Sequence, residues 1–214
     1  MTPLIRAVVL ADVVRSSASS KLPAILQQKL RIATIAHLEE KRISLPYAVT
    51  AGDEFQTLSE NIHEIPALIF DIRRRLHPLQ LRIGVGIGRM LGRIRPPVNT
   101  LTGEPFRMAR GAIEGIKNRR LHKYSALTAF RSTNERFDDL ANLVYGLHDT
   151  LLQSVSVRQW DTISMYEPRW RVDLAAKALK IDVSTASRNL RRGHYWQIAE
   201  TIETMTHVIQ YSFA

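Results

Sequence analysis

The segment Thr50–Gln56, Thr-Ala-Gly-Asp-Glu-Phe-Gln, constrains the fold more than any other stretch of the chain. An extended apolar run, Ile43–Val49, precedes it, and apolar and polar residues alternate after it, so the sequence predicts two strands joined by a tight hairpin. Gly52 provides the permissive backbone that such a turn needs. Asp53 and Glu54 place two carboxylates side by side with no basic neighbour. The tip is therefore either a cation site or one of the many hairpin turns that bind nothing.

A further carboxylate is expected near this hairpin. The apolar run Leu4–Leu10 predicts a buried strand, and Asp12 follows at the point where that strand should emerge from the sheet. A loop of small polar residues comes next and includes Ser16 and Ser17. A helix is expected after it, from Leu22 to about residue 41. The serine-rich loop either cradles a phosphate or caps this helix.

A glycine-rich strand is predicted at Leu79–Ile87. Its pattern does not match a dinucleotide-binding fingerprint, because Gly84 and Gly86 lie within the strand and not in a strand-to-helix turn. Glycines inside a strand are more typical of a bulge or of a close approach by another backbone. We therefore expect something to pack tightly against this strand.

Residues 1–131 are predicted to form an α+β domain. The expected order is strand, helix, hairpin, helix, strand, helix, strand, with the helices on one face of a mostly antiparallel sheet. The helix after the glycine-rich strand opens at Thr102 and carries Arg107 and Arg110 near its start.

Residues 132–214 are predicted to form a separate all-helical domain. Within it, Val172–Arg192 has the pattern of two short helices that meet at a three-residue turn, which is typical of a helix-turn-helix. Ser184 is expected to cap the second helix. The candidate DNA-binding residues are on this second helix: Ser184, Thr185, Ser187, Arg188, Arg191 and Arg192. The alternative is a helical hairpin with a purely structural role.

Charge is distributed unevenly along the chain. The chain has 214 residues, a formal net charge of +10 and a sequence pI near 10.3, which indicates polyanionic partners. Ten Lys or Arg and only two Glu lie between Arg89 and Arg131, whereas nine Lys or Arg and ten Asp or Glu follow from Ser132 onward. The basic stretch is either a phosphate-binding surface or a solvated face. The chain has no cysteine, targeting segment or long apolar run, so we expect a cytoplasmic protein.

These motifs together resemble a known arrangement. Asp12, the hairpin Gly52–Phe55, the strand Leu81–Gly88 and the helix opening Gly103–Arg110 occur in the order found in the palm domain of class III nucleotidyl cyclases and of GGDEF diguanylate cyclases. Combined with a C-terminal helix-turn-helix, the chain most resembles the SatD family of bacterial proteins. The resemblance implies a ferredoxin-like palm domain followed by an all-α helix-turn-helix domain.

The resemblance also implies roles for individual residues. In the cyclases, carboxylates at these positions bind two divalent ions that activate the ribose hydroxyl and hold the triphosphate. Carried over, Asp12 and Asp53 bind Mg²⁺ or Mn²⁺, and Glu54 does so if the GGDEF pattern is the better guide. Arg110 or Arg107 is available for the role of the arginine that steadies the transition state, and both are candidates for the phosphates, with Arg110 the first. Phe106–Arg110 contains no Asn, and Ser44–Ala51 lacks the Lys that selects adenine.

Two functions and a scaffold remain as alternatives. The first is a DNA-binding regulator whose palm domain senses a metal ion with a nucleoside triphosphate or cyclic nucleotide. The second is a metal-dependent nucleotidyl cyclase that makes a nucleotide signal. In the third, both modules have lost their activity. The missing Asn and Lys favour binding over turnover. A homodimer is expected, through the helix at Trp196–Tyr211 or through the palm domain.

Overall fold

The computed structural model describes residues 3–14, 22–118 and 126–214. Five strands form a single sheet: β1 (Leu4–Val13), β2 (Ala48–Ala51), β3 (Glu54–Ser59), β4 (Leu81–Met90) and β5 (Thr128–Ser132). The helices of the sheet region are α1 (Leu22–Glu39), α2 (Ile65–Leu76) and α3 (Glu104–Lys117), with short 3-10 turns at Ile62–Glu64 and Val98–Thr100. The remaining helices are α4 (Glu135–Ser154), α5 (Val157–Tyr166), α6 (Val172–Leu179), α7 (Val183–Arg192) and α8 (Tyr195–Ser212).

The sheet has the strand order β2-β3-β1-β4-β5. Every neighbouring pair is antiparallel except β4 and β5, which run parallel and are joined through α3. The first four strands with α1 and α2 make the split β-α-β arrangement of ferredoxin-like folds. Gly52 and Asp53 are the two residues between β2 and β3, and Gly52 has a φ of 59°. The predicted α+β class and the hairpin are therefore confirmed.

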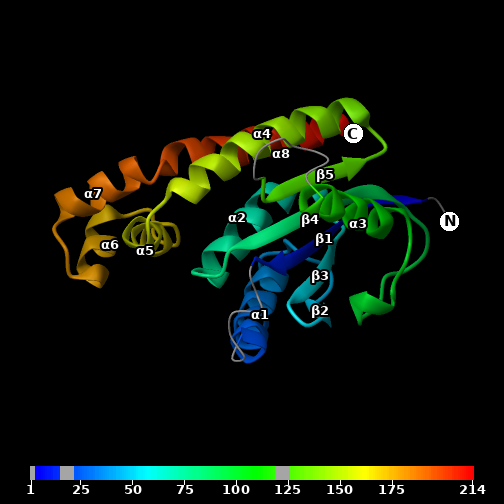
Figure 1. Cartoon of the computed structure of the whole chain (residues 1–214), viewed down its shortest axis with the longest axis horizontal. Coiled ribbons are helices and arrows are strands. Elements are labelled where there is room, and N and C mark those ends of the chain that lie inside the picture. The colour runs from blue at the N-terminus through cyan, green and yellow to red at the C-terminus, as the bar shows by residue number, and fades with distance from the viewer. Residues whose placement is uncertain (1–2, 15–21, 119–125) are drawn as a thin grey trace.

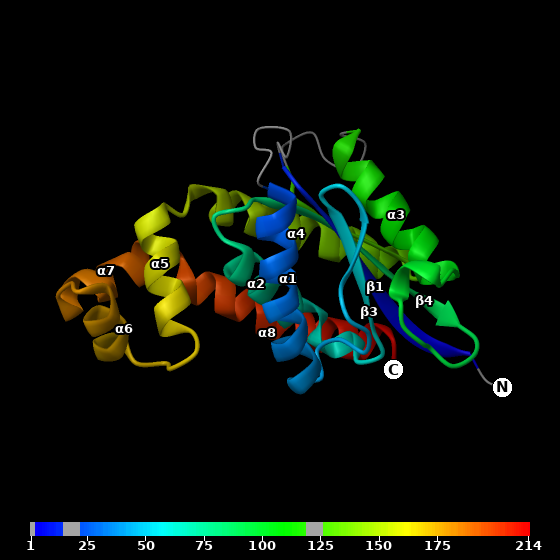
Figure 2. The ribbon, with the colours of Figure 1, turned by 90° about the horizontal axis from the view of Figure 1, so that it is seen from below.

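The two faces of the sheet pack against different helices. Along β1, Val9 and Ala11 face the core that contains α1 and α2, whereas Val8 and Leu10 face the core that contains α3. Figure 2 shows α3 on the opposite side of the sheet from α1 and α2. The prediction that the helices cover one face was wrong. The parallel connection from β4 to β5 carries α3 over the second face.

The glycines of β4 allow α3 to lie close to the sheet. A Cβ atom at Gly84 would lie 2.5 Å from the carbonyl oxygen of Ala109, and one at Gly86 would lie 2.0 Å from the carbonyl oxygen of Pro105. No larger residue fits at either position without a shift of the α3 backbone. The interpretation of these glycines as a close backbone approach is therefore confirmed.

The C-terminal helices extend away from the sheet and return to it. Figure 1 shows α4 and α8 running alongside each other from the group formed by α5, α6 and α7 to the sheet, where they lie beside β5. Tyr145 of α4 and Ile209 of α8 belong to the same hydrophobic cluster as the strands and α2. A second cluster holds α5, α6, α7 and the first half of α8, and Phe70 of α2 contributes to it by stacking on Trp160 at 6.1 Å. Residues of α4 and of the second half of α8 thus share a core with the sheet, whereas α5, α6 and α7 pack in the second cluster.

Candidate functional site

Asp12 and Glu54 lie directly opposite each other on neighbouring strands. They are Cα partners in the antiparallel pairing of β1 with β3. Such partners place their Cβ atoms about 5 Å apart on the same face of a sheet. Both residues follow the parity of Leu10 and Leu58, so they lie on the face that α3 covers. Asp53 occupies the turn immediately before Glu54.

Cations from α3 and β4 hold both carboxylates. Arg110 donates hydrogen bonds of 2.6 and 2.8 Å to the two carboxylate oxygens of Glu54. Lys117 Nζ lies 2.5 Å from one oxygen of Asp12, and an Arg82 nitrogen lies 3.2 Å from the other. Asp12 is 4% exposed, so its charge is largely removed from water and depends on these two partners.

Glu54 and Arg110 stabilise each other's charged form. Burial raises the pKa of Glu54, but the hydrogen bonds from Arg110 and Thr50 and the charges of Arg110 and Lys117 outweigh it, so the net pKa is lowered. The hydrogen bond to Glu54 is the main reason that the pKa of Arg110 is raised. Glu54 is therefore a carboxylate and Arg110 a cation throughout the neutral range.

The donor set suits a divalent ion that shares its coordination with a ligand. Among the described residues, no group of three or more His, Asp or Glu side chains gathers closely enough to hold a metal by itself. Mg²⁺ usually takes one or two protein carboxylates and completes its octahedron with water and substrate phosphates. Asp12 and Glu54 provide such a pair, and Arg110 and Lys117 would be left to contact phosphate oxygens.

The other predicted phosphate ligands do not gather at this pair. Arg107 lines a separate hollow of about 520 Å³ between α3, β5 and the start of α4, together with Arg131 and Asp138. Ser16 and Ser17 lie outside the described residues. Arg89, at the far end of β4, is exposed. The described arginines of the basic stretch are thus distributed over several surfaces.

The predicted DNA-binding helix presents its cations to solvent. Helices α6 and α7 are joined by the three residues 180–182, as predicted, and Ala186 and Leu190 of α7 are buried. Arg188, Arg191 and Arg192 are exposed, and no described acid forms an ion pair with any of them.

The other predicted residues of α7 are also placed. Ser184 and Ser187 are exposed, and Thr185 is half-buried and accepts a hydrogen bond from Arg188. The helix begins at Val183, so Asp182 and not Ser184 occupies the N-cap position. The expectation that Ser184 caps the helix was wrong because the helix begins two residues earlier than that pattern indicated.

Residues 6–192 match the model of the SatD family. The chain belongs to the SatD family. A search of solved structures finds a crystal structure titled as a regulator of polyketide synthase expression from Bifidobacterium adolescentis, 12% identical, with a TM-score of 0.31 over 97% of this chain and 82% of that one. No curated protein matches the chain. In the part of this SatD-family chain that the structure describes, no helix combines the length and apolar character needed to cross a bilayer.

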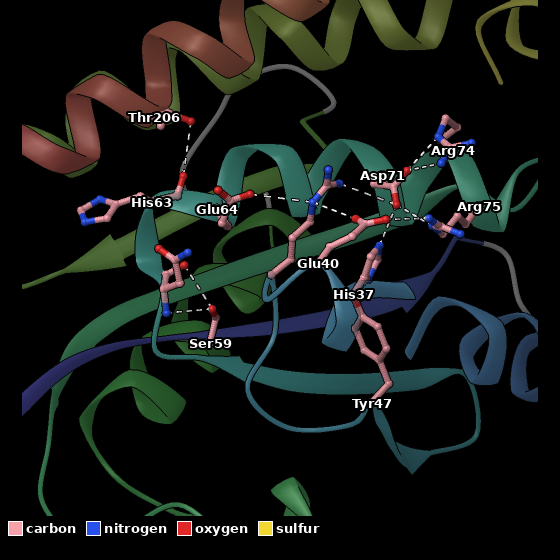
Figure 3. Close-up of polar contacts among 12 residues, drawn as sticks. His37, Glu40, Tyr47, Ser59, His63, Glu64, Asp71, Arg74, Arg75 and Thr206 are labelled. Atoms are coloured by element: carbon pink, nitrogen blue, oxygen red, sulfur yellow. Dashed lines mark hydrogen bonds and ion pairs between the residues drawn. The ribbon is translucent and has the colours of Figure 1, made fainter. Parts of the chain in front are cut away.

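Sequence reasoning missed a buried charge network that supports the hairpin. Asp71 of α2 is 4% exposed and contacts Arg74, Arg75 and the Nε2 atom of His37, and the Nδ1 atom of His37 lies 2.9 Å from the Tyr47 hydroxyl (Figure 3). Tyr47 comes directly before β2, so the network ties the approach to the hairpin onto α1 and α2. Arg74 and Arg75, three and four residues after Asp71, were the only signal in the sequence.

Two cations of the site were also not singled out. Lys117 was counted only as part of the basic stretch, and Arg82 only as a residue of a predicted strand. Both reach Asp12 because of tertiary packing: Lys117 ends α3 directly above it, and Arg82 is its Cα partner on β4. The positions of Lys117 and Arg82 in the sequence do not indicate that either lies near Asp12.

Proposed function

We propose that this SatD-family protein is a DNA-binding regulator whose sheet domain binds a divalent metal ion with a nucleotide. The observation that carries the proposal is the exposed cationic surface of α7. Arg188, Arg191 and Arg192 project from the second helix of a tight helical pair, with no acid paired to them among the described residues. Arginines on such a helix can reach both phosphates and guanine edges in the major groove.

The sensing part of the proposal rests on the opposed carboxylates. Asp12 and Glu54 would hold Mg²⁺ or Mn²⁺, with Asp53 as a further candidate from the adjoining turn. The metal ion would replace the positive charge that Arg110 now brings to Glu54. Arg110 and Lys117 would then contact the phosphates of a nucleoside triphosphate or a cyclic nucleotide. In this proposal, ligand binding replaces the present ion pairs: the two carboxylates pair with the metal ion, and the two cations pair with the phosphates.

The helices supply a physical connection between the two parts. α3 packs on β4 through the glycines, β5 follows α3 in the chain, and α4 leads from β5 to the helical group. Asn142 of α4 exchanges hydrogen bonds with the backbone of Phe130 in β5. A shift of α3 upon binding of phosphates would therefore be passed to α4, which continues directly into α5, and α5 packs against α7.

The test has two stages. Thermal unfolding would be followed with each of the four ribonucleoside triphosphates, with and without Mg²⁺ or Mn²⁺, because a ligand that binds only the folded state raises Tm. Genomic fragments would then be selected with and without the nucleotide that stabilises the protein. We expect a metal-dependent rise in Tm that Asp12→Asn removes, and DNA affinity that depends on the nucleotide. Absence of both effects would reject the proposal.

A nucleotidyl cyclase is the second candidate. It is favoured by the position of Arg110, which lies on the same face as both carboxylates and would contact a phosphate on the metal ions. The incubation with nucleoside triphosphate and Mn²⁺ separates this candidate from the first. A cyclase yields a cyclic or linear dinucleotide or mononucleotide product and pyrophosphate, whereas a sensor leaves the triphosphate intact.

The protein is also proposed to act as a homodimer, since a single helical pair makes few contacts with DNA. Leu140, Leu143 and Leu147 lie three and four residues apart on α4 and are 46%, 57% and 60% exposed. Their spacing matches a self-complementary helix seam. On α8, Trp196 is 52% exposed. Light scattering should give the mass of a dimer, and Leu143→Glu should give a monomer if α4 forms the interface.

A further inference from the structure

Every carboxylate oxygen of Asp12 and Glu54 already has a cation of the protein beside it. Lys117 Nζ lies 2.5 Å from one oxygen of Asp12, and an Arg82 nitrogen lies 3.2 Å from the other. Arg110 donates to both oxygens of Glu54. This cluster therefore contains two negative and three positive side chains before any metal ion is added. A metal ion has to compete with these cations for the carboxylates.

Of the two cations on Asp12, Lys117 is the one that can leave. It lies in the last turn of α3, and its side chain is 38% exposed. A lysine carries a compact ammonium group on a flexible four-carbon stem, so Lys117 can turn outward into water. Arg82 is fixed beside Asp12 by the pairing of β1 with β4. Asp12 is 4% exposed and cannot follow Lys117 into water, so it would need another cation in its place.

Arg110 and Lys117 lie on one face of α3. They are seven residues apart, which is two turns of an α-helix. Close packing of α3 on Gly84 and Gly86 holds this face near the sheet, with Arg110 on Glu54 and Lys117 on Asp12. A chain of phosphates that lies along this face can therefore meet both cations.

The ion pairs disfavour binding of a metal ion or of a phosphate chain alone. A metal ion alone would be placed beside Lys117 and Arg110, and like charges at such short range repel each other. A phosphate chain alone would draw the two cations away and leave the buried charge of Asp12 without its lysine. When both bind, the carboxylates pair with the metal ion and the cations pair with the phosphates, so every charge keeps a partner.

We propose that Lys117 is an internal counter-ion that makes metal binding at Asp12 and Glu54 conditional on a polyphosphate chain. This inference rests on the metal and nucleotide binding proposed above. It adds that free metal ions bind weakly and that the phosphate chain, and not the base or the sugar, opens the site. The coupling is reciprocal, because the metal ion strengthens phosphate binding by the same factor. It favours a nucleoside triphosphate over a cyclic nucleotide, which carries fewer negative charges.

The first measurement is the affinity of the full chain for Mn²⁺ without any phosphate, from the paramagnetic resonance signal of the free ion. Lys117→Met removes the charge and keeps a long side chain, so the affinity should rise about tenfold. Lys117→Arg keeps the charge and should bind Mn²⁺ like the wild type. Lys177→Met is the matched control, because it makes the same change at an exposed lysine in the last turn of α6. It should also bind like the wild type.

The second measurement is thermal unfolding with Mn²⁺, with tripolyphosphate and with both. For the wild type, the rise in Tm with both should exceed the sum of the two separate rises. For Lys117→Met, Mn²⁺ alone should raise Tm, and tripolyphosphate should add less than it adds to the wild type, because a cation that contacts the phosphates is lost. A residue that only stabilises the fold would not change metal and phosphate binding in opposite directions.

Two results would overturn the inference. One is equal affinity of Lys117→Met and the wild type for Mn²⁺. The other is additive effects of Mn²⁺ and tripolyphosphate on the Tm of the wild type, a result that does not depend on how well the variant folds. Equal binding that Asp12→Asn removes would leave the metal site and the proposed function in place. The proposed function fails through a different result, which is the absence of any metal-dependent rise in Tm with the four triphosphates.

Discussion

Arg110 of α3 donates hydrogen bonds of 2.6 and 2.8 Å to the two carboxylate oxygens of Glu54 at the start of β3. The ion pair joins α3, on one face of the sheet, to β3, the second strand of the hairpin. The Arg110 side chain is 46% exposed and that of Glu54 12%, so solvent screens much of their attraction. The contact is therefore weak enough for Arg110 to change partners upon binding of the proposed ligand.

Arg110→Ala should abolish the nucleotide-dependent rise in Tm and change the free energy of unfolding by less than about 1 kcal/mol. The reason is that a partly exposed ion pair adds little to the fold, whereas a phosphate bound at the proposed metal site, beside Asp12 and Glu54, needs the cation. Thermal unfolding with and without nucleotide and Mg²⁺ measures both quantities on one variant. Arg89→Ala, at an exposed arginine at the far end of β4, is the control and should respond like the wild type. A full nucleotide response in Arg110→Ala would exclude Arg110 from the phosphate site.

Gly86→Ala should destabilise the protein by about 1 to 3 kcal/mol, because the added Cβ overpacks the junction of β4 and α3. It would lie 2.0 Å from the backbone of Pro105 and 2.3 Å from that of Ala109, so the helix itself has to move. Urea unfolding measures the change, and the displaced α3 should also weaken nucleotide binding. Gly111→Ala on α3 is the matched control: its Cβ meets only the flexible end of Arg131, and alanine favours a helix, so stability should stay equal or rise.

The local features of the site could be predicted from the sequence. Gly52 and the alternation after it indicate a hairpin wherever the segment is placed in the fold, and Gly84 and Gly86 indicate a close backbone approach whatever the approaching element is. The sequence does not show, in contrast, which acid lies opposite Asp12. Its identity depends on the register between β1 and β3, which long-range packing sets, and a shift of one residue exchanges the two faces.

The parts that could not be predicted are all partnerships between distant segments. Ile209 indicates an apolar face on the last helix, but nothing in that helix states that the face returns to the core of the sheet. Lys117 is one basic residue among ten until α3 is laid over Asp12. Asp71 has a sequence spacing to Arg74 and Arg75 that fits an ordinary surface pair, and only burial against His37 makes it a structural charge.

Replacing Arg188 and Arg191 by alanine should weaken DNA binding and reduce its salt dependence. The slope of log K against log salt should fall by about 1 for each phosphate contact that is lost. Fluorescence anisotropy on a fragment selected by the wild type, over a series of salt concentrations, measures both effects. The double variant Arg93→Ala, Arg95→Ala removes two exposed arginines of the basic stretch instead. If this control loses affinity and the α7 variant does not, DNA binds to the sheet domain and the helical pair is structural.

Asp71→Asn should destabilise the protein at neutral pH by about 3 kcal/mol, because it leaves the partly buried Arg74 and Arg75 without their counter-charge. Burial alone would raise the pKa of Asp71, but the hydrogen bond with His37 and the charges and hydrogen bonds of Arg74 and Arg75 outweigh it, so the pKa falls below its ordinary 3.8. A carboxylate whose folded pKa is depressed stabilises the fold above its unfolded pKa, and the contribution disappears as the pH falls through the folded value. The difference in unfolding free energy between wild type and variant should thus be constant from about pH 7 to about pH 5 and narrow below about pH 4. Urea unfolding across this range measures the difference.

Asp173→Asn, in the exposed ion pair with Arg171, is the control and should change stability little at any of these pH values. A difference for Asp71→Asn that stays constant down to the acid limit of folding would show that the network does not depend on the charge of Asp71.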